Sequence, residues 1–164
     1  QGGCVKFKEF VTPIGARYFE DYEADCTYDC GQRLVLESEI IEFAQRYDPQ
    51  PFHIDPVEAR RSIYGGVIAS GWHTGALTMR LLVENYVSTV ASLGSPGIET
   101  LRWPAPVRPG DTLAVTVEVL EARVSRSKPD RGIVRSKVRT SNQKGVQVMA
   151  LVSANFFLRR STHE

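Results

Sequence analysis

Apolar and polar residues alternate through the last third of the chain, which is the period-two pattern of strands with one buried face. One such run places Leu113, Val115, Val117 and Val119 on a single side of an extended segment. Proline, glycine, aspartate and asparagine turns divide this region into short runs. The expected strands cover residues 98–107, 112–124, 133–140 and 146–158. Strands joined by short turns predict an antiparallel meander.

The middle of the chain has the helical period instead. A short strand over 32–37 is followed by a helix that Ser38 caps and that must end by Asp48, because Pro49 follows. Asp55 before Pro56 predicts a second helix, which ends by Gly65.

A third helix, over about 72–91, is apolar on most sides, so we expect it to be buried inside the sheet. Residues 4–31 are expected to be irregular, with 17–22 packing as a lid or an arm. One central helix with an antiparallel sheet curled around it is an α+β fold.

Composition narrows the class of protein further. The 164 residues fit a single domain over 4–164, and the opening Gln1-Gly2-Gly3 resembles a tag remnant. A formal charge of +1 gives no overall field that would attract nucleic acid or a membrane. Three cysteines make an odd number, which favours free thiols and a cytoplasmic location. Cys26 and Cys30 lack a matching second pair, so we expect no metal site.

The candidate chemistry lies on a loop that two prolines stiffen. Asp48 and His53 are five residues apart, with Pro49 and Pro51 between them. A rigid loop that carries a carboxylate and an imidazole suits acid–base catalysis. Downstream, Gly71 precedes the third helix, whose free N–H groups can bind a developing negative charge.

The sequence Asp48-Pro49-Gln50-Pro51-Phe52-His53 resembles the Asp-x-Asn-Pro-x-His signature of MaoC-like, (R)-specific enoyl-CoA hydratases and dehydratases. The flanking segments 18–22, 66–71, 101–103 and 107–111 are also similar to that family. The resemblance implies a single hot-dog domain, a homodimer or an assembly of dimers paired edge to edge, and an acyl-CoA substrate bound at the interface.

Carried over by position, Asp48 and His53 match the catalytic pair, and the backbone N–H of Gly71 matches the donor to the thioester oxygen. Its neighbours Ser70 and Trp72 are candidate substrate-binding residues. Two departures concern Gln50, where the signature has Asn, and Met79, where some members present Ser.

Basic residues gather between 123 and 144, with Asp130 the single acidic residue among them. Arg126, Lys128 and Arg131 are candidate contacts for the phosphates of coenzyme A. The alternative is a solvated hairpin face, and nucleic-acid binding is disfavoured because no aromatic residues are interleaved. His73 and Asp55 are interpreted as structural residues.

The sequence therefore predicts an enoyl-CoA hydratase or dehydratase that needs no cofactor, since coenzyme A is part of the substrate. Two alternatives stay open. A hot-dog thioesterase would need an acid on the central helix, where Glu84 is the only one. A non-catalytic acyl-CoA-binding subunit would tolerate Gln50 and Met79.

Overall fold

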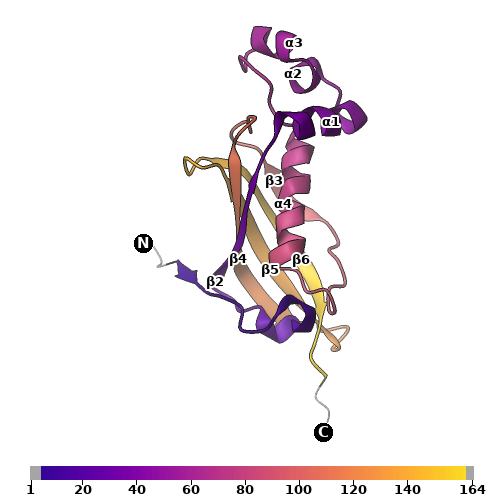
Figure 1. Cartoon of the computed structure of the whole chain (residues 1–164). Coiled ribbons are helices and arrows are strands. Elements are labelled where there is room, and N and C mark those ends of the chain that lie inside the picture. Colours follow the sequence, from indigo (N-terminus) through magenta and orange to yellow (C-terminus); the bar gives the residue numbers. More distant parts are fainter. Residues whose placement is uncertain (1–4, 162–164) are drawn as a thin grey trace.

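A computed structural model describes residues 5–161 of the chain. Figure 1 shows the elements in chain order. They are β1 (Lys6–Phe7), the 3₁₀ turns η1 (Ile14–Ala16) and η2 (Phe19–Asp21), β2 (Cys26–Leu34), α1 (Glu37–Tyr47), α2 (Pro51–Ile54), α3 (Pro56–Arg61), α4 (Gly71–Asn85), β3 (Ile98–Arg102), β4 (Thr112–Val124), β5 (Arg131–Ser141) and β6 (Gln147–Leu158).

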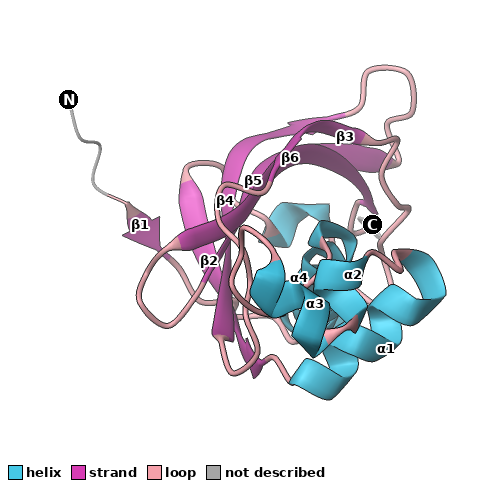
Figure 2. Cartoon of the chain, turned by 90° about the horizontal axis from the view of Figure 1, so that it is seen from above, coloured by secondary structure: helices cyan, strands magenta, loops and turns pink. Residues whose placement is uncertain are grey.

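The strands form one six-stranded sheet in the order β1-β2-β4-β5-β6-β3. Every neighbouring pair is antiparallel except the short β1 and β2. The sheet curls around α4, and α1, α2 and α3 gather at one end of that helix (Figures 1 and 2). This is the hot-dog arrangement, and it confirms the predicted α+β class.

The alternating pattern produces the predicted hairpins. Leu113, Val115, Val117 and Val119 of β4 are all buried, so they line the concave face of the sheet. β4 pairs with β5 and β5 with β6 along almost their whole lengths. Asp55 accepts hydrogen bonds from the backbone N–H groups of residues 57 and 58, which confirms the predicted start of α3.

The core divides into two clusters along α4. Around its C-terminal half, Leu81 and Leu82 pack with aromatic rings that include Tyr28 and Phe157. Around its N-terminal half, Leu77 packs with residues such as Val35, Ile40 and Val148. The second cluster supports the short helices that surround the α4 N-terminus.

The N-terminal segment is more ordered than predicted. The expectation of an irregular stretch up to residue 31 is wrong, because β2 begins at Cys26. The segment 17–22 is an arm rather than a lid: its rings Phe19 and Tyr22 are buried in the core at the end of the molecule away from α1, α2 and α3 (Figure 1).

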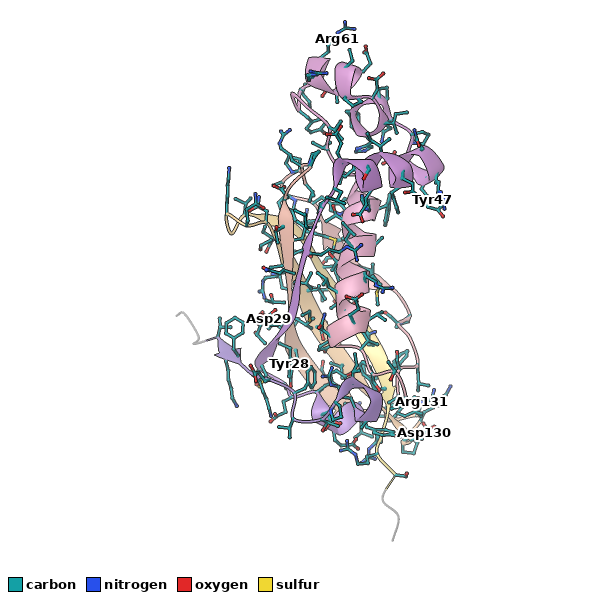
Figure 3. The ribbon with its side chains drawn as sticks, viewed as in Figure 1. Tyr28, Asp29, Tyr47, Arg61, Asp130 and Arg131 are labelled. Atoms are coloured by element: carbon teal, nitrogen blue, oxygen red, sulfur yellow. The ribbon has the colours of Figure 1, made fainter. Side chains whose placement is uncertain are left out.

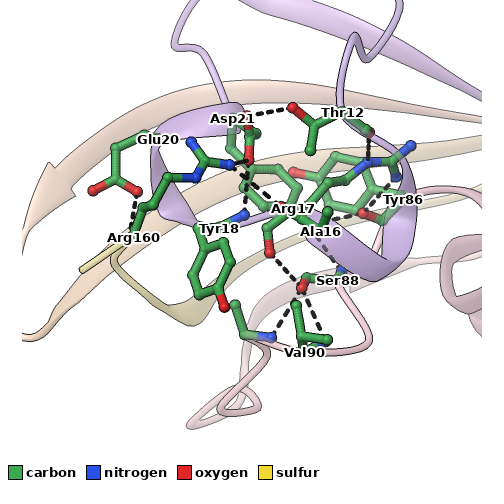
Figure 4. Close-up of polar contacts among 12 residues, drawn as sticks. Thr12, Ala16, Arg17, Tyr18, Glu20, Asp21, Tyr86, Ser88, Val90 and Arg160 are labelled. Atoms are coloured by element: carbon green, nitrogen blue, oxygen red, sulfur yellow. Dashed lines mark hydrogen bonds and ion pairs between the residues drawn. The ribbon is translucent and has the colours of Figure 1, made fainter. Parts of the chain in front are cut away.

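Helix α4 ends six residues before the predicted Ala91. The guanidinium of Arg17 donates hydrogen bonds to the carbonyl oxygens of Asn85 at 2.7 Å and Tyr86 at 3.2 Å (Figure 4). The Tyr22 hydroxyl donates to the Tyr86 carbonyl as well, at 2.8 Å. These contacts satisfy carbonyl groups that have no partner within the helix.

The expectation that α4 is buried on most sides holds for only part of the helix. Trp72, Met79 and Val83 are 62%, 46% and 46% exposed, and Ala76 is exposed between them. Their spacing of four, three and four residues places them on one face. This apolar face of α4 is open to solvent in the single chain.

Cys26 and Cys30 are buried free thiols, and burial raises the pKa of Cys30 to about 12. No helix among residues 5–161 has the length and hydropathy of a membrane span. Residues 1–3 and Cys4 lie outside the described residues. The cytoplasmic location stays a prediction.

Candidate active site

Two short elements hold the candidate acid–base pair. Asp48 directly follows α1, and its N–H donates to the carbonyl of Ala44 at 2.8 Å. Pro49 prevents the helix from continuing, and Pro51 begins the single turn of α2, which carries His53. The loop predicted from its prolines is therefore partly helical, and both functional side chains are fixed at helix ends.

His53 is 4% exposed, and both of its ring nitrogens have partners. Nδ1 lies 2.6 Å from the carbonyl oxygen of Ile68, and Nε2 lies 3.2 Å from Oδ2 of Asp48. A carbonyl oxygen can only accept, so Nδ1 carries a hydrogen and donates it. Nε2 and a carboxylate oxygen then attract each other only when one proton is shared between them. The geometry thus makes His53 and Asp48 a pair between which one proton can be exchanged.

Asp48 is kept ionised by its neighbours. Burial alone would raise its pKa, but hydrogen bonds and the charge of His53 outweigh that effect and lower the pKa below its ordinary value. The amide of Gln50 donates to Oδ1 at 2.7 Å. The buried Ser70 hydroxyl also helps to lower this pKa, although it has no hydrogen-bond partner at ordinary distance among the described residues. Gln50, the departure from the signature, thus takes part in orienting the carboxylate.

The N-terminus of α4 supplies a pair of free backbone donors. Ser70 precedes the helix, and its carbonyl accepts from the N–H groups of His73 at 2.9 Å and Thr74 at 3.1 Å. Among the described residues, the N–H groups of Gly71 and Trp72 donate to no backbone oxygen. Free N–H groups at the positive end of a 15-residue helix suit a ligand oxygen that gains negative charge.

These parts meet at one cavity of about 450 Å³. Its walls are the loop after α1, the first turn of α4 and the proline-rich segment after β3. The lining residues are Asp48, Gln50, Phe52, His53, Tyr64, Ile68, Ala69, Gly71, Trp72, Thr74, Trp103, Pro104, Ala105, Pro106, Val107 and Val148. A cavity of this size with both apolar and polar side chains in its walls is typical of a small-molecule site.

Trp103 gives Gly71 a second role. A Cβ atom at position 71 would lie 2.6 Å from Cε2 of the Trp103 ring, closer than real Cβ contacts. Glycine is therefore required by packing as well as by the approach of a ligand. Sequence reasoning missed Trp103 and the prolines after it as lining residues; the signal was the unusual run of prolines that follows a strand.

The structure brings five of the eight predicted site residues together: Asp48, His53, Ser70, Gly71 and Trp72. The other three lie on the turn between β4 and β5, at the opposite end of the molecule. Figure 3 shows Arg131 there, whereas Tyr47, the neighbour of Asp48, lies at the cavity end. Arg131 also forms a two-pronged ion pair with Asp130, at 2.8 and 3.0 Å. The role of Arg126, Lys128 and Arg131 in binding coenzyme A stays a prediction.

Two residues near the site have structural surroundings. The His73 ring is buried and stacks on Phe43, with 4.8 Å between centroids, and it does not line the cavity. Met79 lies on the exposed face of α4, and its neighbour Thr78 hydrogen-bonds Thr140 at 2.8 Å. Met79 therefore leaves the cavity walls unchanged.

No set of three or more metal-ligating side chains occurs within residues 5–161. The expectation that no cofactor is needed stays a prediction.

Fold and site together define a hot-dog protein whose cavity is lined by an Asp–His pair and by the N-terminus of a helix. A family model described as the MaoC like domain matches residues 10–142. The chain therefore belongs to the MaoC-like dehydratase family.

Individual relatives agree with this assignment. A MaoC-like dehydratase from Rhodospirillum rubrum superimposes with a TM-score of 0.80 and 41% identity, over 90% of this chain and all of that one. The uncharacterized protein YdeM of Bacillus subtilis is 32% identical over 70% of this chain and 79% of its own length. A 3-hydroxybutyryl-CoA dehydratase of Methylorubrum extorquens is 34% identical over 63% of this chain, a match that spans 64% of that dehydratase.

Proposed function

We propose that the protein adds water to the 2,3 double bond of an enoyl-CoA, or removes it from the corresponding 3-hydroxyacyl-CoA. The observation that carries this proposal is the 3.2 Å contact between Asp48 and His53 inside a cavity that the free N–H groups of α4 also reach. The R. rubrum and M. extorquens relatives, both named as dehydratases, support the reaction class.

The reaction follows from the groups present. One water molecule binds beside the pair, within reach of both Asp48 Oδ2 and His53 Nε2, and its oxygen forms a bond to C3 of the substrate. The pair takes one proton from that water and returns one proton to C2, so its proton count is unchanged after the cycle. The N–H of Gly71 binds the thioester oxygen while the enolate forms, an interaction worth about 3–4 kcal/mol in comparable sites.

The thioesterase alternative finds no support in the geometry. Glu84 lies near the C-terminal end of α4, is exposed and pairs with Arg80, whereas the cavity lies at the other end of the helix. No carboxylate of α4 thus reaches the cavity.

Crotonyl-CoA tests the proposal directly. Incubation with the protein should remove the absorbance of the conjugated double bond without releasing free thiol. Release of thiol would instead identify a thioesterase, and no change in either signal would identify a non-catalytic binding protein. The Asp48→Asn variant is the matched control, because it keeps the shape of the side chain and should leave the absorbance unchanged.

We also infer a two-fold homodimer, or an assembly of such dimers. β3 is an edge strand with unpaired backbone groups, and edges of this kind are normally covered. The apolar face of α4, formed by Trp72, Ala76, Met79 and Val83, is also uncovered. Light scattering should show a species of at least twice 18.3 kDa, and Met79→Glu should shift it toward the monomer. A wild-type protein found only at 18.3 kDa at micromolar concentration would reject the dimer.

A further inference from the structure

Both tryptophans of the chain lie at the cavity. The rings of Trp72 and Trp103 meet edge to face, with 5.1 Å between centroids and an interplanar angle of 80°. In the single chain they are 62% and 40% exposed, and both rings line the cavity. The proposed reaction uses neither side chain.

The Trp103 ring is held in place on several sides. It lies against the backbone of Gly71, where an added Cβ would come within 3.0 Å of three ring atoms. Pro104 and Pro106 restrict the segment that follows it. The end of that segment is tied to the irregular segment leading into α4, because the N–H of Ala69 donates to the carbonyl of Val107 at 2.9 Å. The backbone of this wall of the cavity therefore has little conformational freedom.

A second lining residue, His53, is also fixed. His53 is buried, and its Nδ1 hydrogen bond to Ile68 at 2.6 Å holds the orientation of the ring. A thioester oxygen bound at the N–H of Gly71 places C1 and C2 of the acyl group beside the surface that Trp103 covers. C2 then lies in the part of the cavity that the indole of Trp103 and the imidazole of His53 both line.

We propose that Trp103 determines substrate specificity at C2, and that it restricts the cavity to acyl groups with no branch at that carbon. The inference rests on the proposed function, because that function places the thioester oxygen at Gly71. A rigid pocket discriminates one methyl-sized group by about 10- to 200-fold. The same discrimination should appear in the dissociation constants of unreactive analogues, since it comes from the shape of the cavity beside Trp103.

Saturated analogues measure this discrimination without any chemical step. Butyryl-CoA and isobutyryl-CoA have acyl groups with the same number of carbons, and isobutyryl-CoA is branched at C2. Calorimetric titration of the wild-type protein should give a dissociation constant at least about 10-fold higher for isobutyryl-CoA. In Trp103→Leu the two constants should approach each other to within about three-fold, mainly because the branched analogue binds more tightly.

Two further variants distinguish an effect of the Trp103 ring on specificity from an effect on folding. Trp103→Phe keeps an aromatic ring of smaller size and should give an intermediate ratio, so it answers the question if the leucine variant does not fold. Trp72→Phe keeps an aromatic partner for Trp103 and tests whether the effect is specific to Trp103. A smaller change in the ratio than in Trp103→Phe is expected, and an equal or larger change would overturn the role of Trp103. Thermal unfolding of each sample verifies that folded protein is compared.

The possible outcomes are distinct. Equal affinities in the wild-type protein, no binding of either analogue, or a ratio that Trp103→Leu and Trp103→Phe leave unchanged would each overturn the role of Trp103. If the wild-type protein hydrates crotonyl-CoA but gives one of these results, only the role of Trp103 is refuted and the proposed reaction stands. If the affinity ratios are as expected but crotonyl-CoA is not hydrated, the role of Trp103 in specificity stands and the proposed reaction is refuted.

Discussion

Replacing Asp48 by Asn removes a charge from the proposed proton pair while it preserves the shape of the side chain. The amide cannot share a proton with His53 Nε2, so the 3.2 Å contact no longer serves as a proton path. Acid–base groups of this kind contribute about 10²- to 10⁴-fold to a rate. Hydration of crotonyl-CoA should lose at least about 10²-fold in kcat, which corresponds to about 2.7 kcal/mol of activation free energy.

His53→Ala should cause a similar kinetic loss together with a loss of stability. The buried carbonyl of Ile68 would lose the donor that now lies 2.6 Å away, at a cost of about 1–3 kcal/mol. For a chain of this length, each kcal/mol lowers Tm by about 2–4 °C. The double variant should lose little more kcat than the worse single variant, because both groups act on the same water.

Turnover and thermal unfolding measured on the same samples decide this prediction. Rates are compared per mole of folded protein, so that the stability loss in His53→Ala does not count as a catalytic loss. Near-normal hydration by folded Asp48→Asn would refute the assignment of this loop as the catalytic site. Fully additive losses in the double variant would refute the claim that the two residues share one water.

Three further measurements test other parts of the structure. Gly132→Ala should lower the free energy of unfolding by about 1–3 kcal/mol, because a Cβ would lie 2.0 Å from the ring of Phe19. If the same substitution lowered the free energy of unfolding equally in a Phe19→Leu background, this packing would be contradicted. Burial lowers the pKa of His73, so the unfolded chain binds the proton more readily, and stability should fall as the pH drops below about 6.5. His73→Gln should flatten that slope in urea titrations, and identical slopes would show that His73 does not cause it. Replacing Arg126, Lys128 or Arg131 by alanine should raise KM with little change in kcat. If KM is unchanged in all three variants, these residues form only a solvated hairpin face.

The sequence predicted the elements whose signals are local. Alternation from Leu113 to Val119 and the Asp55-Pro56 pair depend on neighbours along the chain, and the structure has the corresponding strand and helix. β2 was missed over its first half because its alternation is interrupted. Gly31 adopts a φ of +80°, and the pairing with β4 shifts between Asp29 and Gln32, which marks a bulge.

The end of α4 and the shape of the cavity depend on contacts between distant segments. Arg17 binds carbonyl groups at the end of α4, 68 and 69 residues away. Trp103 reaches Gly71 across 32 positions, and only the folded chain shows that its ring covers that glycine. The contact between Asp48 and His53 was predictable because the two residues are close in sequence, whereas the walls of the cavity come from several elements.

The cavity and the 125–131 turn lie at opposite ends of α4, and this separation links two of the predictions. In a dimer formed by antiparallel pairing of two β3 strands, the two-fold axis reverses the direction of the neighbouring sheet. The partner's 125–131 turn is then carried toward the cavity end of this chain. A hairpin contact with coenzyme A therefore requires the dimer, and the KM effect of the alanine variants should vanish when Met79→Glu separates the subunits. A KM effect that persists in the monomer would show that the turn acts on its own chain, which the distance between the two ends of α4 argues against.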